Sequence, residues 1–417
     1  MDLPWHRLDE DGFDKVTLVG QTFALAQGYG NFVEKLVHDF PREEEGLRHY
    51  AHLLECSAKE QAQALSPLPS QTDDAQQSMA TGAWDFLENT FKDPVLRNVL
   101  SGTSLRMELR RETLPLFSFL HGNGSFVESS WRLKGDGSLM VDKLAEGIRG
   151  QGGEIICRAE VEELVEKDGK LVCAVCTNGE RYEADTFISD IHPAATCALV
   201  KESSRMKRVY RRRISDVQNS FGMFTVSLVF EPDKLRYFNY NQYVYGKQDV
   251  WSVHENQSDG VRGVLVSCRV PEDGSEYARQ VDLLTPMPWS ACESWLGTKI
   301  GHRGTEYEEL KERVADECIA LAARVLPEIK GYSFRYTSTP LTWHDYTLTP
   351  EGCAYGMRKD YRNPLMTVLS PRTPIPNLLL TGQNLMLHGV HGVTMTAFHT
   401  CAEVMGREAV WEIIGKE

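Results

Sequence analysis

The sequence lacks three features that would each have pointed to a class of protein. Its 45 basic residues against 59 acidic ones give a formal net charge of −14, which argues against a nucleic-acid partner because phosphates require a basic surface. No apolar run approaches the length of a bilayer span, and the first residues given match no signal-peptide pattern. Ten cysteines are present, but Cys173 and Cys176 form the sole C-x-x-C, on a predicted strand that sends them to opposite faces. We therefore expect no metal site, free thiols and a cytoplasmic location.

A complete dinucleotide-binding fingerprint is also missing. The nearest approach is Gly28 and Gly30, which follow a predicted strand at 16–26 and precede a predicted helix at 31–40, but Val33 holds the third glycine position. The G-x-G-x-x-G turn needs its glycines for close approach to a pyrophosphate. We interpret this segment as an ordinary turn.

The most informative segment that is present lies at 377–397. Leu378 to Leu380 predict a short buried strand, Gly382 ends it, and a loop with Gly389 and Gly392 leads into a predicted helix from about Val393 to Ile414. A strand, glycine loop and helix amino terminus present free backbone N–H groups and a positive dipole end. This geometry suits the pyrimidine edge of a flavin, although an ordinary β–loop–α connection has the same pattern.

A second segment, 134–193, predicts a helix with apolar Leu139, Leu144 and Ile148 and then a strand at 154–157. Two hairpin turns, Asp168–Gly169 and Asn178–Gly179, bound a strand at 171–176, and a further strand is expected at 184–189. A helix, a parallel strand, a three-stranded meander and a return strand, in this order, are typical of the second half of a flavin-binding domain.

These two segments, together with 342–356, resemble the phytoene desaturase, carotenoid isomerase and retinol saturase family of flavoproteins. The resemblance is most specific at 131–193 and 340–400. It implies FAD and a redox or isomerisation reaction on conjugated double bonds of an apolar substrate; NAD(P) is not indicated. Family members open with a βαβ unit that grips the FAD pyrophosphate, and the chain begins downstream of it. We therefore expect weak FAD binding and derivation from a longer protein.

The predicted fold is α/β, with a glutathione-reductase-like (Rossmann-type) FAD domain, incomplete at its amino end, and a mixed sheet-plus-helix substrate domain. We assign 1–127 and 201–339 to the substrate domain, and 128–200 and 340–417 to the FAD domain. In the substrate domain we expect helices at 31–64 and 79–120, a loop at 66–74, strands at 223–230, 250–254, 264–268 and 280–284, and a helix capped by Thr305 and Glu308.

The resemblance implies roles for residues at matching positions. Val161 is expected to offer its backbone to the adenine, and Gly382, Gln383 and Asn384 to approach the ribityl and phosphate groups. The N–H groups of Gly392, Val393 and Thr394 are expected to face the flavin carbonyl. Proton donors are sought among nearby side chains: Tyr355, His388, His391 and His399.

The predicted function is FAD-dependent desaturation, saturation or isomerisation of a polyene- or retinoid-like substrate. Two alternatives stay open: a cofactor-free remnant that acts only through protein interaction, and a flavin amine or quinone oxidoreductase on the same scaffold. The one basic cluster, 201–213, is either a contact for anionic lipid or a solvated helix face. The sequence does not indicate an oligomeric state.

Overall fold

A seven-stranded mixed sheet supports one side of the molecule in a computed structural model that describes residues 2–63, 73–254 and 260–415. Along its central strands β9, β11 and β12, side chains alternate between buried and partly exposed, which is the pattern of a sheet with one face in the core. The strands, in spatial order, are β13 (Phe334–Ser338), β9 (Gly222–Val229), β12 (Gln280–Met287), β11 (Gly263–Cys268), β10 (Asn241–Tyr245), β2 (Asp14–Leu18) and β3 (Gln21–Leu25).

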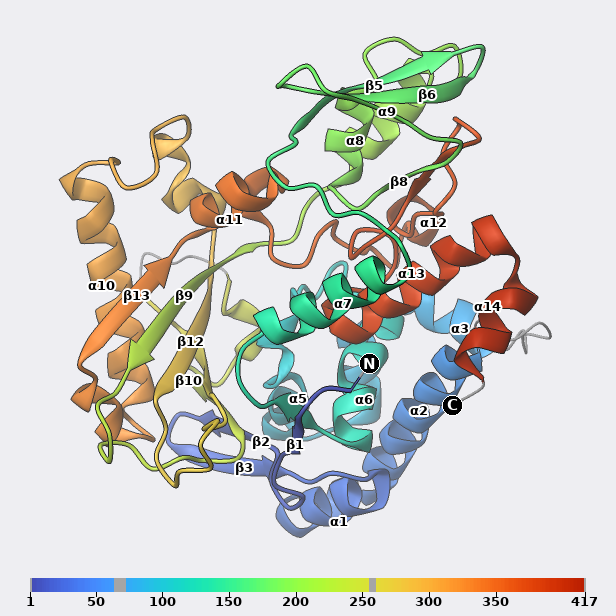
Figure 1. The fold of residues 1–417 in the computed structure, drawn as a ribbon. Helices are drawn as coiled ribbons and strands as arrows, with labels where there is room; N and C mark the ends of the chain where they lie inside the picture. Colours follow the sequence, from blue (N-terminus) through green and yellow to red (C-terminus); the bar gives the residue numbers. More distant parts are fainter. Residues whose placement is uncertain (1, 64–72, 255–259, 416–417) are drawn as a thin grey trace.

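The first hairpin of the chain joins this sheet because β2 pairs in parallel with β10, far away in the sequence. Helix α10 (Thr305–Ala322) packs on the sheet through Cys318 and Leu321. Helices α1 (Tyr29–Asp39), α2 (Glu44–Gln63) and α6 (Leu116–Glu128) form the core beside β2 and β3 (Figure 1).

The other half of the molecule contains the elements expected of a flavin-type domain. A three-stranded meander is formed by β5 (Val161–Lys167), β6 (Lys170–Cys176) and β7 (Arg181–Glu183). Strand β8 (Phe187–Ser189) pairs in parallel with β14 (Leu378–Leu380). Helices α7 (Ser138–Gly150), α13 (Gly389–Met405) and α14 (Arg407–Ile414) complete this half, in which the meander lies at one end (Figure 1).

Short elements connect the two halves. Strand β1 (Trp5–Arg7) pairs with β4 (Trp131–Leu133) at the boundary. The remaining helices are α3 (Asp73–Met79), α4 (Ala83–Thr90), α5 (Pro94–Ser101), α8 (Pro193–Leu199), α9 (Arg208–Ser215), α11 (Pro340–Thr347) and α12 (Pro364–Thr367). The 3-10 turns are η1 (Pro41–Glu43), η2 (Ser104–Arg106), η3 (Val250–Ser252), η5 (Trp289–Ala291), η6 (Glu293–Trp295), η7 (Pro327–Gly331) and η8 (Pro350–Gly352).

The structure corrects several sequence predictions. The strand predicted at 16–26 is a hairpin that turns at Val19 and Gly20, both at positive φ. The strand expected at 250–254 is the turn η3, and 154–157 forms no ladder. The long helix expected to reach Ile414 breaks at Gly406 (φ 89°). Gly304, not Thr305, precedes α10, so the expected capping box does not form. Most of the loop predicted at 66–74 lies outside the described residues.

Candidate flavin and substrate site

The glycine loop after β14 depends on two close approaches. Gly382 has φ 87°, and a Cβ there would overlap the carboxylate of Asp190 at the end of β8. A Cβ on Gly392 would lie 2.8 Å from the Leu387 backbone. Both positions therefore require glycine, because a side chain would push the loop away from β8 or unwind the start of α13.

Helix α13 starts at Gly389 after the N-cap residue His388, whose side chain makes no capping hydrogen bond. The backbone N–H groups without an intrahelical acceptor are therefore those of residues 388–391. The N–H groups of Gly392, Val393 and Thr394 point to carbonyls one turn earlier, and the Thr394 hydroxyl donates to the Val390 carbonyl at 2.8 Å. The expected donors to a flavin carbonyl thus lie one turn too far along the chain, because the helix begins four residues before the predicted start.

This helix start opens into a cavity of about 930 Å³. Its lining comes from helix α6, the turn η2, the loop leading into α13, strands β11 and β12 of the large sheet, the β1–β4 pair, the segment 135–140 at the start of α7, and residues 354–355. Its volume is in the range of small-molecule sites. Apolar side chains provide much of the wall: Trp5, Phe126, Trp131, Leu133, Leu265, Leu284, Leu387 and Val390.

The cavity brings together half of the predicted site residues. Tyr355, Gln383, His388, His391 and Gly392 line it. Other predicted residues lie outside the lining: Val161, Gly382, Asn384, Val393 and Thr394. His399 is on α13 and also lies outside the lining.

Asn384 has a structural role that its position in the loop did not suggest. Its side chain is buried, and its Oδ1 accepts the Met357 N–H at 3.1 Å. Val161 begins β5, where it pairs with Cys176 and packs on the core of the meander.

The rings of Tyr355 and His388 lie side by side, and each side chain donates a hydrogen bond to a backbone carbonyl of the turn η2. Their ring centroids are 4.7 Å apart. The Tyr355 hydroxyl donates to the Leu105 carbonyl at 2.6 Å, and His388 Nε2 lies 2.8 Å from the Arg106 carbonyl, which can only accept. Burial raises the pKa of Tyr355 and lowers the pKa of His388 to about 4. Both protons are thus used to hold the turn η2, and both side chains are neutral near pH 7.

The ring of His391 is exposed, lines the cavity and makes no hydrogen bond within the described residues, so its ring nitrogens are available for proton transfer. A second histidine, His121 on α6, was missed by the sequence analysis. Its Nδ1 lies 2.9 Å from the Phe117 carbonyl, and burial together with the nearby His391 lowers its pKa to about 4. Ser118, His121 and Ser125 recur at helical spacing and all line the cavity, a polar stripe that could have revealed this face.

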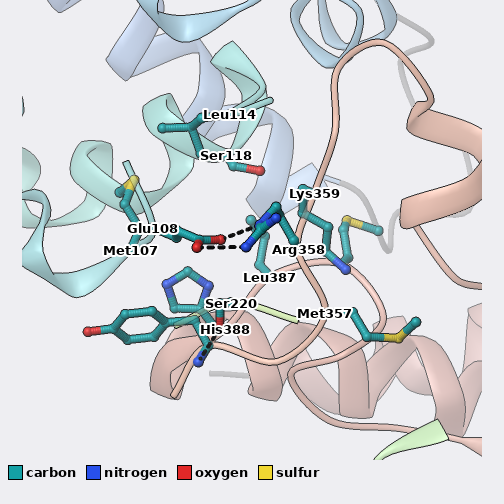
Figure 2. A pocket seen from close by; sticks show the side chains of 12 residues that line it. Met107, Glu108, Leu114, Ser118, Ser220, Met357, Arg358, Lys359, Leu387 and His388 are labelled. Carbon is teal, nitrogen blue, oxygen red and sulfur yellow. Dashed lines mark hydrogen bonds and ion pairs between the residues drawn. The ribbon is translucent and has the colours of Figure 1, made fainter. Parts of the chain in front are cut away.

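A smaller pocket of about 40 Å³ shares Tyr355 and His388 with the cavity. In its lining, Glu108 forms a two-pronged ion pair with Arg358, at 2.6 Å to Nε and 3.0 Å to Nη2. Figure 2 shows the Glu108 carboxylate facing the Arg358 guanidinium. The neighbouring Lys359 Nζ donates to the carbonyls of Thr367 (2.9 Å) and Asn384 (2.8 Å), and burial lowers its pKa to about 7. Lys359 thereby ties the glycine loop to α12, a role that the sequence pattern did not reveal.

No family model matches the chain. It is 25% identical to the all-trans-retinol 13,14-reductase of Danio rerio over 67% of the chain and 50% of the reductase. It is 22% identical to the Rattus norvegicus reductase over 95% of the chain and 72% of that protein. The prolycopene isomerase 1 of an Oncidium hybrid cultivar is 24% identical over 79% of the chain and 57% of the isomerase. The chain thus spans about half the length of several relatives that it matches.

Solved structures show the same fold. An oxidoreductase from Methanosarcina mazei superposes with a TM-score of 0.61 at 14% identity, over 96% of this chain and 82% of that one. Cyclohexylamine oxidase from Brevibacterium oxydans gives 0.59 at 10% identity, over 99% and 83%. These similarities confirm the predicted α/β fold class and the predicted resemblance. The chain is related by sequence to the retinol 13,14-reductases and the prolycopene isomerases, and it has the fold of the FAD-dependent oxidoreductases.

Proposed function

We propose that the chain carries out FAD-dependent chemistry on conjugated carbon–carbon double bonds of an apolar substrate, as desaturation, saturation or isomerisation. The observation that carries this proposal is the opening of the α13 amino terminus into a cavity of about 930 Å³ with a largely apolar wall. The names of the sequence relatives, a retinol reductase and a prolycopene isomerase, support the substrate class. The described residues contain no helix long and apolar enough to cross a membrane.

The residues around the glycine loop fit the pyrimidine edge of FAD. Four backbone N–H groups at residues 388–391 lack an intrahelical acceptor, and no side chain caps them. They would face the flavin carbonyl, where a positive helix end favours negative charge. Gly382 and Gln383 would lie near the ribityl and phosphate groups, and Val161 near the adenine. These assignments rest on the family resemblance and on the uncapped amino terminus of α13.

FAD, when bound, would supply hydride exchange at its N5 atom. The chain would hold the substrate against Leu265, Leu284 and Phe126, which exclude water. In the saturating direction, His391 would give a proton to the carbon next to the one that receives hydride. Tyr355 and His388 would keep η2 in place and take no part in proton transfer, because their protons are bonded to carbonyls.

A cationic amine is a poorer match to this cavity, although amine oxidases share the fold. Three arginines line the cavity, and Asp136 is the one carboxylate in its lining. Positive charge would repel an ammonium group.

The visible absorption spectrum of the purified 417-residue chain, with and without excess FAD, tests the proposal. Flavin bands near roughly 375 and 450 nm that persist through desalting are expected if the cofactor binds. The loaded protein would then be assayed with all-trans-retinol and prolycopene. A protein that stays colourless with FAD contradicts flavin binding, and a yellow protein inactive on both polyenes contradicts the substrate assignment.

A further inference from the structure

We propose that Arg132 makes one end of the cavity a site for the carboxylate head group of an apolar ligand. This inference rests on the proposed function because it names the class of substrate that the same cavity takes: an apolar chain with an acidic end.

Hydrogen bonds to the large sheet hold the Arg132 guanidinium in place. Arg132 belongs to β4, and its guanidinium reaches the large sheet. There Nη2 donates to Asn241 Oδ1 at 2.8 Å and to the Tyr240 carbonyl at 3.3 Å, and Nη1 donates to the Cys268 carbonyl. These bonds use three of the five N–H hydrogens and fix the plane of the group. The Tyr237 hydroxyl oxygen accepts a further hydrogen bond from Arg132, so one N–H hydrogen of the guanidinium remains for a ligand.

The charges around Arg132 leave it without a carboxylate of its own. Asp14 is fully buried, and its Oδ2 pairs with Arg106 Nη2 at 2.9 Å. Its Oδ1 accepts from Asn241 Nδ2 at 2.8 Å, so Asn241 separates Asp14 from Arg132. The charges of Arg106 and Arg132 both act on this one carboxylate. Within the described residues no carboxylate lies within ion-pair distance of Arg132, which leaves an excess positive charge in the cavity wall.

The other charged groups in the lining do not cancel this excess. Arg269 is paired with Asp282 at 3.0 Å. Asp136 is exposed, and its Oδ1 accepts the Ser138 N–H at 2.7 Å at the start of α7. A guanidinium that lines an apolar cavity without a paired carboxylate is suited to a ligand carboxylate, because charge-assisted hydrogen bonds are short and strong.

The surroundings of Arg132 suit an amphipathic ligand. Trp5 and Trp131 line this end of the cavity and are 48% and 50% exposed, so the cavity meets solvent between aromatic side chains. Leu133 and Leu265 continue the lining. An apolar tail would lie along these side chains, and the acidic head would stay near Arg132 and solvent.

The test compares a fluorescent polyene acid with its neutral ester. cis-Parinaric acid and its methyl ester are titrated into the purified chain at pH 8 and low salt, without FAD. We expect the acid to bind at least about tenfold more tightly than the ester, the effect of one charge-assisted contact. Arg132→Gln should bring the two affinities to within about twofold of each other, whereas Arg132→Lys should keep part of the preference. The control is Arg48→Gln, at an exposed arginine of α2 outside the lining that pairs with Glu44.

Binding of the ester also reports whether each variant keeps its cavity. The affinity for the ester should be the same in the unmodified chain and in the three variants. Equal binding of acid and ester by the unmodified chain overturns the proposal, and so does a preference that Arg132→Gln leaves unchanged. Failure of either ligand to bind overturns it too. The assay contains no flavin, so a negative result here does not contradict the proposed flavin binding. Conversely, a protein that binds no FAD but prefers the acid over the ester still supports the proposed role of Arg132.

Discussion

The two halves of the molecule contain similar elements but bury them very differently. In the sheet half, β9, β11 and β12 place their inward side chains in a continuous core with α10. In the flavin-type half, α7 has no buried residue, and its apolar Leu144 is 52% exposed. Ile188 on β8 is exposed to the same extent. An amphipathic pattern predicts a helix or strand equally well in both halves, but only neighbouring elements remove its apolar face from water. Strands β5, β6 and β14 share a buried core with α8 and α9, whereas α7 gains little stabilisation from burial.

The largest expected effect is the loss of a core aromatic in the well-packed half. Trp251 is fully buried, stacks edge-on against Trp84 at 5.2 Å and donates to Ser101 at 3.0 Å. Trp251→Ala should lower the free energy of unfolding by about 3–5 kcal/mol, because it leaves a large cavity in the core. Urea denaturation measures this change. Trp131→Ala, at a tryptophan that is 50% exposed, is the control and should cost far less; equal losses would contradict the link between burial and stability.

The second prediction tests whether the close approach at the glycine loop is needed for flavin binding. Gly382→Val should abolish detectable FAD binding or weaken it at least about tenfold, because the new side chain meets Asp190 at a positive φ. Retention of flavin absorbance after desalting measures binding. Gly179→Val is the matched control: Gly179 has nearly the same φ (85°), but a Cβ there meets nothing within 4 Å. If both variants lose FAD equally, the close approach at Gly382 is not the cause.

The third prediction concerns pH, at the boundary of the two halves. Burial lowers the folded-state pKa of His388 to about 4 from an ordinary value of 6.5. Between these pH values the unfolded chain binds more protons than the folded one, so stability falls as pH falls from 6.5 to 4, by at most about 1.4 kcal/mol per pH unit from this group. His388→Gln should remove that part of the slope. Urea denaturation of both proteins at several pH values measures it, and parallel curves would contradict the assignment.

The smallest expected effect is at α7. Leu144→Ala should change the free energy of unfolding by less than about 0.5 kcal/mol, because the side chain is already half exposed. Leu283→Ala, at a buried leucine of β12, is the comparison and should cost about 2–5 kcal/mol. A large loss at Leu144 would mean that another element covers α7 in solution.

Local elements with strong turn chemistry were predictable. The meander appears where the Asp168–Gly169 and Asn178–Gly179 turns indicated, and β14 has the predicted bounds. The prediction failed where a short apolar run had no neighbour to pair with, as at 154–157, or where a buried run packed as the turn η3 at Trp251. Periodicity alone does not separate these cases.

The order of elements in the flavin-type half, the glycine loop and the position of His391 near it follow from local sequence, because turns, glycines and strand alternation are set by local sterics. Which side chains converge on the cavity depends on long-range strand pairing. His121, Arg106 and Arg132 reach the cavity because β2 pairs with β10 and β1 with β4 across long stretches of chain. The same folding engages Tyr355 and His388 with the carbonyls of η2. Such long-range contacts leave no periodic trace in the sequence. They determine which of the candidate side chains remain free for proton transfer.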